Sequence, residues 1–249
     1  MTRGRGVLIS ASILNADFSR LDRVVHKLER AGVDRLHLDV MDGHFVDNLT
    51  FGPDVVAAFR RLTAMPLDVH LMISEPSRYL SRFLEAEPDT LTFHVEVDET
   101  DEQKGDTLRA ISAAGRGAGL AMSPGTPVVA AEPFADLLDL IMVMTVEPGW
   151  GGQGFLPEAA AKIHAVRAVL ARAGRGGLVH VDGGVNRDTA EVVGGQGADV
   201  CVVGSALFQR GRDAADEVRL VRDRARQGRA AAGAPGAVGG TAAQATAAG

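Results

Sequence analysis

Eight short apolar runs alternate with segments of helical spacing along this chain, and this alternation limits the possible folds more than any other feature. The runs are rich in β-branched residues and begin near residues 7, 35, 66, 90, 118, 140, 178 and 199. Segments whose apolar residues lie three and four positions apart fall between them, at 18–32, 53–63, 76–86, 157–174 and 186–198. Strand and helix repeated eight times in about 220 residues predict an α/β protein with a single closed (β/α)8 TIM barrel.

Residues at the expected helix ends support this interpretation. Positions suited to helix caps, first turns and C-terminal ends are Asp17 or Ser19, Pro53, Pro157, Gly32 and Gly174. The alternative is an open doubly wound sheet. Candidate functional residues follow runs one, two, three, six, seven and eight, which a barrel gathers around one mouth but an open sheet spreads along a line. This distribution favours the barrel.

One domain accounts for most of the 249 residues. No segment in the middle has the composition of a linker, so we expect a single catalytic barrel over residues 1–227. Apolar residues make up 46% of the sequence and aromatic residues 4%, which suits parallel strands buried on both faces. Residues 228–249 are rich in Ala and Gly with almost no large apolar side chain, so we expect a disordered C-terminal tail there.

Charge and hydropathy exclude several classes of function. The net charge is -6 and the basic residues are dispersed, so we expect no nucleic acid partner. No run approaches the roughly 18 apolar residues of a membrane span, and the N-terminal MTRGRGVLIS lacks the apolar stretch of a signal peptide. The single cysteine, Cys201, lies in an apolar run and suits a reducing compartment. These features predict a soluble cytoplasmic protein.

Histidine and aspartate residues at three separate strand ends form a candidate metal site. Because side chains two apart in a strand share one face, His37 and Asp39 point the same way in the second run. His70 in the third run and Asp182 in the seventh would join them at a barrel mouth. Two imidazoles and two carboxylates suit one divalent ion per subunit, Zn²⁺, Fe²⁺, Mn²⁺ or Co²⁺. From the sequence alone, the alternative is a hydrogen-bonded cluster without a metal.

The other histidines are weaker candidates for a functional role. His26 and His164 fall in helical segments, where surface positions are common. His44 follows a turn and His180 precedes the second aspartate by two residues, so both lie near the candidate site in sequence. His94 ends the fourth run and is left unassigned.

Three methionines stand among the strand-end residues, namely Met41, Met72 and Met144. A single methionine usually fills space in a core. Three that face one cavity would form a polarizable, water-poor wall, which favours proton transfer without competition from solvent.

Glycine clusters follow three consecutive runs, as GWGGQGF at 149–155, DGGV at 182–185 and GSALF at 204–208. Glycine allows a ligand to approach the backbone closely, and successive N–H groups ahead of a helix attract anions. The ends of the last strands are also where barrels often bind phosphate. We therefore expect a phosphate site there.

Seven motifs between Ile9 and Phe208 closely resemble the ribulose-phosphate 3-epimerases. They are SASILNADF, LHLDVMDGHFVDNLTFGP, LDVHLMI, AMSPGTP, VMTVEPGWGGQGF, VDGGV and GSALF. The resemblance implies that Asp39 and Asp182 are the catalytic acid and base and that they bind the metal together with His37 and His70. It also implies that Ser12 and His70 contact the substrate and that the methionine wall shields an enediolate. The implied phosphate-binding residues are Gly149, Trp150, Gly151, Gly152, Gly183, Gly184, Gly204 and Ser205.

The resemblance further implies a metal-dependent isomerase of carbohydrate metabolism, placed in the pentose phosphate pathway and active as a homo-oligomer. It would interconvert D-ribulose 5-phosphate and D-xylulose 5-phosphate by two-base proton transfer at C3 through an enediolate. The alternatives are an epimerase of a six-carbon ketose 6-phosphate and a non-catalytic phosphate- or metal-binding barrel. A related decarboxylase would need a lysine between two aspartates in the second run, and residues 39–42 contain none.

Overall fold

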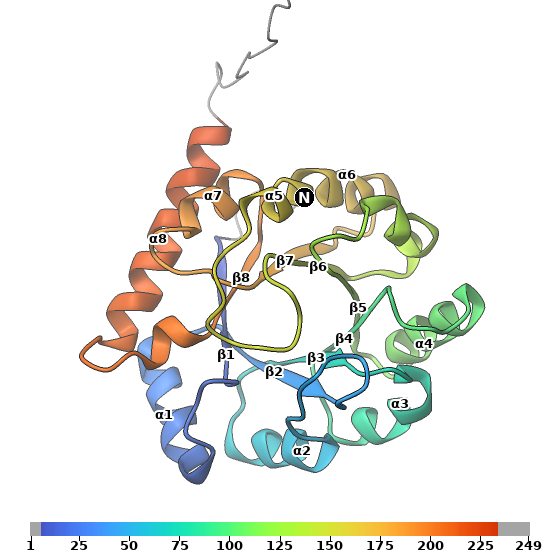
Figure 1. Ribbon diagram of the computed structural model, residues 1–249, viewed down its shortest axis with the longest axis horizontal. Coiled ribbons are helices and arrows are strands. Elements are labelled where there is room, and N and C mark those ends of the chain that lie inside the picture. The colour runs from blue at the N-terminus through green and yellow to red at the C-terminus, as the bar shows by residue number, and fades with distance from the viewer. Residues whose placement is uncertain (1–5, 234–249) are drawn as a thin grey trace, which may run out of the picture.

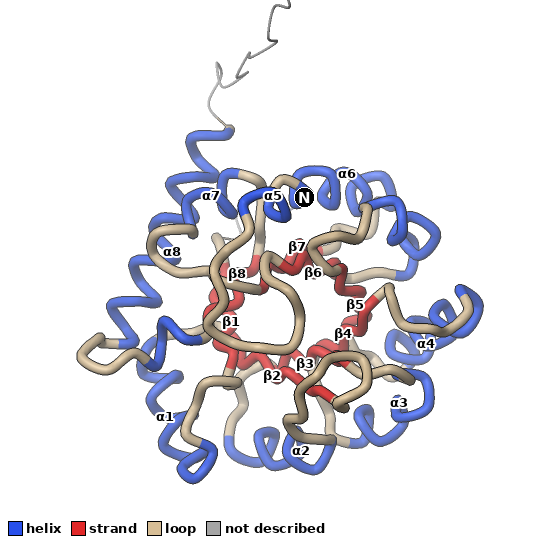
Figure 2. The backbone as a smooth tube through the Cα atoms, viewed as in Figure 1, coloured by secondary structure: helices blue, strands red, loops and turns tan. Residues whose placement is uncertain are grey.

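The computed structural model describes residues 6–233, which form a closed barrel of parallel strands surrounded by helices (Figures 1 and 2). Each expected apolar run contains a strand, and β1 pairs with β8 to close the barrel. The predicted TIM barrel is confirmed, and the open sheet is wrong. The strands are β1 (Leu8–Ser12), β2 (Arg35–Met41), β3 (Leu67–Met72), β4 (Thr90–His94), β5 (Gly117–Met122), β6 (Leu140–Met144), β7 (Leu178–Asp182) and β8 (Val200–Val203).

A helical segment follows every strand and packs on the outside of the barrel (Figure 2). All five segments of helical spacing are confirmed as helical, and the fourth is divided between two helices. The helical elements are η1 (Phe18–Arg20), α1 (Leu21–Ala31), α2 (Pro53–Leu62), α3 (Pro76–Glu85), α4 (Asp101–Ala113), η2 (Val128–Leu137), α5 (Pro157–Ala160), α6 (Lys162–Ala173), α7 (Ala190–Gly195), η3 (Ser205–Phe208) and α8 (Ala214–Ala232).

The helix ends have the expected chemistry. The Asp17 carboxylate accepts a hydrogen bond from the Ser19 backbone N–H at the start of η1. Pro53 and Pro157 occupy first turns, where a missing N–H costs no helical hydrogen bond. Gly32 and Gly174 end α1 and α6 in the left-handed conformation, with φ of 77° and 71°.

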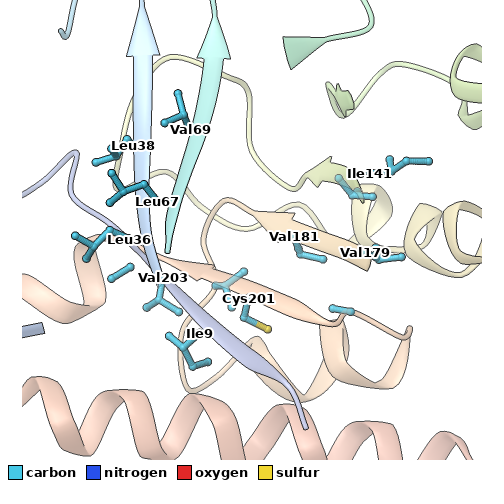
Figure 3. Close-up of a cluster of buried hydrophobic side chains, with 14 of the residues drawn as sticks. Ile9, Leu36, Leu38, Leu67, Val69, Ile141, Val179, Val181, Cys201 and Val203 are labelled. Carbon is cyan, nitrogen blue, oxygen red and sulfur yellow. The ribbon is translucent and has the colours of Figure 1, made fainter. Parts of the chain in front are cut away.

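Alternation along the strands separates an outer apolar layer from an interior in which polar and apolar side chains are mixed. One set of strand residues packs against the helices, and Figure 3 labels ten of them: Ile9, Leu36, Leu38, Leu67, Val69, Ile141, Val179, Val181, Cys201 and Val203. The residues between them point the other way. Asp68 on β3 lies 3.4 Å from His180 on β7, although these strands are not neighbours, so this contact crosses the barrel interior.

The strand register brings the functional residues to one level. Asp39 on β2 is paired with His70 on β3, and Met41 is paired with Met72 at the end of the same two strands. Met144 on β6 is paired with Asp182 on β7. The carboxyl ends of these strands therefore present carboxylate, imidazole and thioether groups around one opening.

The last helix ends later than the sequence analysis predicts. The expected domain boundary at residue 227 lies within α8, which continues to Ala232, and Gly228 is buried. Large apolar side chains are absent from residues 228–232, but a small residue stabilises this turn by letting two helices approach closely. The rest of the expected tail, residues 234–249, lies outside the described residues. Among the helices within residues 6–233, none is both long and apolar enough to cross a membrane.

Two glycines allow α7 and α8 to pack closely. A methyl group on Gly194 of α7 would overlap the backbone carbonyl of Ala225, and one on Gly228 of α8 would overlap the carbonyl of Glu191. Backbone atoms of a packed helix cannot move aside as the end of a flexible side chain can. The crossing therefore requires glycine on both helices.

A pair of neighbouring substitutions tests this packing. Gly194→Ala should lower the free energy of unfolding by roughly 1–3 kcal/mol, because overpacking forces the helices apart. Gly195→Ala would make only an ordinary contact, 3.5 Å from the Gly228 carbonyl oxygen, and should leave stability unchanged or slightly higher. Urea unfolding followed by circular dichroism measures both. Equal losses in the two variants would contradict the close crossing.

Candidate active site

Four side chains meet at the carboxyl ends of β2, β3 and β7. His37, Asp39, His70 and Asp182 each place one nitrogen or oxygen within 4.8 Å of the others. The predicted grouping of these residues is confirmed. The two histidines are fully buried, whereas the Asp182 side chain is 16% exposed and so remains accessible from the mouth of the barrel.

Asp39 is at the centre of the cluster. Its Oδ1 lies 3.1 Å from His37 Nε2 and 3.3 Å from His70 Nδ1. The Ser12 hydroxyl donates to its Oδ2 at 2.7 Å. Asp182 is held less tightly, since its Oδ2 lies 3.7 Å from the same nitrogen of each histidine. The two carboxylates therefore face the same pair of imidazole nitrogens.

A third carboxylate, Asp68, lies deeper in the barrel and has no role in the sequence analysis. Its Oδ2 is 3.1 Å from His37 Nδ1, and it accepts hydrogen bonds from the Ser10 and Thr90 hydroxyls at 3.3 and 2.5 Å. Because His37 Nδ1 contacts Asp68, its Nε2 is directed toward Asp39. The sequence does contain a signal for a role of Asp68 in the site, because Asp68 precedes His70 by two residues and shares its face of the strand.

Burial and neighbouring charges give the two candidate catalytic aspartates different pKa values. Burial, and after it the charge of Asp39, raises the pKa of Asp182 to about 7. Burial alone would also raise the pKa of Asp39, but the charge and hydrogen bond of His37 hold it well below its usual range. Near neutral pH one carboxyl group is thus ionised while its partner can carry a proton.

The pKa values of the two histidines in the cluster, His37 and His70, also differ. Burial would lower the pKa of His37, but Asp39 and Asp68 on its two sides raise it well above the ordinary value. For His70, burial outweighs the favourable effect of Asp39 and lowers the pKa. Protons on His37 and Asp182 thus compensate the negative charge of the cluster.

The donor set fits a divalent cation. Ligand histidines must be neutral and ligand carboxylates ionised, so a bound cation would take the place of the compensating protons. Two imidazole nitrogens and two carboxylate oxygens suit Zn²⁺, Fe²⁺, Mn²⁺ or Co²⁺ better than Mg²⁺ or Ca²⁺, which prefer oxygen ligands. The second contact of His37, with Asp68, is the kind of partner that orients metal-binding histidines.

A cavity of about 310 Å³ opens above the cluster. Asp39 and Asp182 reach its wall, whereas His37 and His70 lie beneath it. The remaining residues of the predicted site that line it are Ser12, Met41, Met72, Met144, Gly149, Trp150, Gly151, Gly152, Gly183, Gly184, Gly204 and Ser205. The structure thus brings every predicted site residue to one cavity or directly below it.

The glycine-rich loops form one side of this cavity, and their backbone packs closely against neighbouring residues. Gly183 and Gly184 have φ of 117° and 65°, and side chains there would collide with Val146 and Phe155. The Asn48 amide donates to the Gly149 carbonyl at 2.7 Å and joins the loop after β2 to the loop after β6. The wall also contains polar residues that the sequence analysis does not predict, Asn15, Gln153, Asn186, Asp188, Gln209 and Arg212.

The other histidines fall into two groups. His26, His44 and His164 are exposed, away from the cluster. His180 and His94 are fully buried. His180 Nδ1 is 3.4 Å from Asp68, and His94 contacts His70 directly. His94, left unassigned from the sequence, is therefore a neighbour of the candidate metal site.

Histidine titration tests the electrostatics of the cluster. In cation-free protein, His37 should stay protonated at pH values above the ordinary histidine range, because two carboxylates flank it. His70 should stay neutral down to pH values below that range, because it is buried. The ¹⁵N shifts of the imidazole rings measured against pH report both. Asp68→Asn should shift the His37 titration to lower pH, because it removes one of the two flanking charges. Protonation of His70 before His37 on lowering the pH would contradict this account.

Solved structures of other proteins share the barrel at low sequence identity. The 3-hexulose-6-phosphate synthase from Salmonella typhimurium matches with a TM-score of 0.66 at 17% identity, over 89% of this chain and 100% of that chain. The 3-keto-L-gulonate-6-phosphate decarboxylase from Vibrio cholerae matches with a TM-score of 0.67 at 13% identity, over 88% of this chain and 97% of that chain. At these identities the likeness shows the fold alone.

Sequence comparisons are more specific. The model of the ribulose-phosphate 3 epimerase family matches residues 8–208. A ribulose-phosphate 3-epimerase from Rhodobacter capsulatus is 44% identical over 218 residues, which cover 88% of this chain and 93% of that protein. One from Mycobacterium bovis is 46% identical over 206 residues, which cover 82% and 86%. Because the family model and these relatives cover most of the chain, it belongs to the ribulose-phosphate 3-epimerase family.

Proposed function

We propose that this protein interconverts D-ribulose 5-phosphate and D-xylulose 5-phosphate by inverting C3, with the help of a divalent cation. The observation that carries the proposal is the meeting of Asp39 and Asp182 at one buried point beneath a cavity. Family membership and the names of the curated relatives support the reaction and substrate.

The substrate would lie between the glycine loops and the aspartates. Its phosphate would bind at residues 149–152, 183–184 and 204–205, where small side chains let it reach backbone N–H groups. Its C2 and C3 atoms would then lie over Asp39 and Asp182. Ser12 would support the reacting end, because its hydroxyl already holds the outer oxygen of Asp39.

His37, Asp39, His70 and Asp182 would hold one cation per subunit, with Zn²⁺, Fe²⁺, Mn²⁺ and Co²⁺ as candidates. When bound, the cation would supply positive charge that stabilises the developing negative charge of an enediolate. The protein residues do the rest of the chemistry. Met41, Met72 and Met144 would exclude water from the proton-transfer region while adding no competing acid or base.

The two aspartates would divide the proton transfers between them. Asp39, whose pKa is held low, would accept the C3 proton of ribulose 5-phosphate. Asp182, whose pKa is raised, would donate a proton to the opposite face. In the reverse direction their roles exchange. Because the two carboxyl groups lie close together, the proton of one affects the other, and the pair titrates as one unit.

Two alternatives come from the sequence analysis. The patterns around the second aspartate and last strand favour the pentulose over a six-carbon ketose 6-phosphate, and assays with both substrates discriminate between them. A non-catalytic phosphate- or metal-binding barrel would need a missing acid or base, and both aspartates are in place. The homo-oligomeric state and the cytoplasmic location stay predictions.

Removal of the cation tests its role. Dialysis against a chelator should reduce turnover of ribulose 5-phosphate by at least about 10²-fold, because the enediolate loses its main charge stabilisation. The fold should persist, since the apolar layer between strands and helices does not depend on the cation. A coupled assay, circular dichroism and readdition of each candidate cation in turn measure these effects. Full activity in rigorously metal-free protein would contradict the metal role.

Hydrogen isotopes distinguish two aspartates from a single base that carries one proton across the substrate. With two bases, the proton delivered to C3 comes from a group that has exchanged with solvent. Xylulose 5-phosphate formed from ribulose 5-phosphate in the first turnovers in D₂O should therefore carry deuterium at C3. Mass spectrometry at low conversion measures this. Largely undeuterated product would overturn the two-base mechanism, even with epimerase activity present.

A further inference from the structure

His70 makes a second contact on the side away from the aspartates. Its Nε2 lies 2.9 Å from Nε2 of His94, with the ring centroids 5.0 Å apart and the ring planes inclined by 23°. His94 Nδ1 in turn lies 2.9 Å from Oε2 of Glu96. A chain of three side chains thus runs from a candidate metal ligand to a carboxylate outside the cluster.

Glu96 is itself fixed by the loop after β5. Its Oε1 accepts hydrogen bonds from the backbone N–H of Ser123, at 2.7 Å, and from the Thr126 hydroxyl. The Lys162 ammonium group donates to the carbonyl oxygens of Ser123 and Thr126 at 2.7 and 3.0 Å and so ties this loop to α6. The loop belongs to the AMSPGTP motif, which the proposed reaction leaves without a role.

The position of each proton in the chain follows from Glu96. Three hydrogen bonds hold the pKa of Glu96 at about 2 against the opposing effect of burial, so its carboxylate can only accept. His94 therefore carries its proton on Nδ1, which leaves a lone pair on Nε2. His70 must then donate from Nε2, so its Nδ1 is left unprotonated. This lone pair faces Asp39 and Asp182.

We propose that Glu96 is a positioning residue that acts through His94 to fix the tautomer and ring orientation of His70 for cation binding. The loop 123–126 serves as its support. The inference rests on the proposed function, since it concerns the cation that His70 would help to hold. Residues outside the cluster would thus control the orientation of one metal ligand, as hydrogen-bond partners of metal-binding histidines commonly do.

Glu96→Gln tests the proposal because the substitution keeps shape and reverses the donor pattern. The Ser123 N–H can only donate, so the amide oxygen of the new side chain should take the place of Oε1. Its NH₂ group then faces His94 Nδ1 and donates to it. His94 must carry its proton on Nε2 and donate to His70, whose own proton moves to Nδ1. The ligand nitrogen is then blocked.

Two measurements read out this change. In cation-free protein with ¹⁵N-labelled histidine rings, His70 should be protonated at Nε2 in the unsubstituted chain and at Nδ1 in Glu96→Gln. Titration with Zn²⁺ by calorimetry should show affinity weakened by roughly 10- to 100-fold. A loss of stability alone would leave the His70 tautomer unchanged, and that outcome would overturn the proposal.

Glu99→Gln is the matched control. Glu99 accepts from the backbone N–H and hydroxyl of Ser77 at 3.0 and 2.6 Å, so it anchors a neighbouring loop in the same way but contacts no histidine. It should keep the tautomer and the Zn²⁺ affinity unchanged. Equal affinity in Glu96→Gln and the unsubstituted chain would overturn the inference alone. If the unsubstituted protein bound no cation, the proposed function would fail, and the His70 tautomer would still decide whether Glu96 controls the ring.

Discussion

Closure of the barrel at a fixed register is the constraint on which the rest of the structure depends. Successive residues of each strand point to opposite sides, so one set builds the apolar layer beneath the helices and the other fills the interior. The outer layer supplies the hydrophobic burial that holds the fold together. The interior can therefore carry charged residues near the mouth, where Asp39, His70 and Asp182 meet.

Charges placed in this interior are stable only as a group. Asp39 and Asp68 are removed from water and Asp182 is largely so, and the cost of that removal is offset by the imidazoles between them. The offset is uneven. Asp39 has two imidazole nitrogens and a hydroxyl within 3.3 Å, whereas the nearest imidazole nitrogens to Asp182 are 3.7 Å away. Burial and the charge of Asp39 raise the pKa of Asp182, whereas His37 holds the pKa of Asp39 low, so the two carboxyl groups differ in protonation near neutral pH.

Most of the site could be predicted from the sequence because its residues occur in motifs at strand ends. The roles of the outer partners could not. The sequence shows that Asp68 shares a strand face with His70, but not that it contacts His37 on β2, and nothing in the sequence links Glu96 through His94 to His70 on β3. The last helix extends past the boundary that composition predicts for a similar reason, since Gly228 has no side chain to indicate burial and its close neighbour on α7 is distant in sequence.

The sequence by itself determined the strand and helix periodicity, the barrel, and the residue types of the site, because these follow from local patterns of burial and turn chemistry. Only the tertiary structure decided which nitrogen of each histidine faces the cluster, which aspartate is ionised, and which loop supports His70. These properties depend on distances of a few ångströms between strands. A one-dimensional pattern contains no such distances, because register and barrel closure set them together.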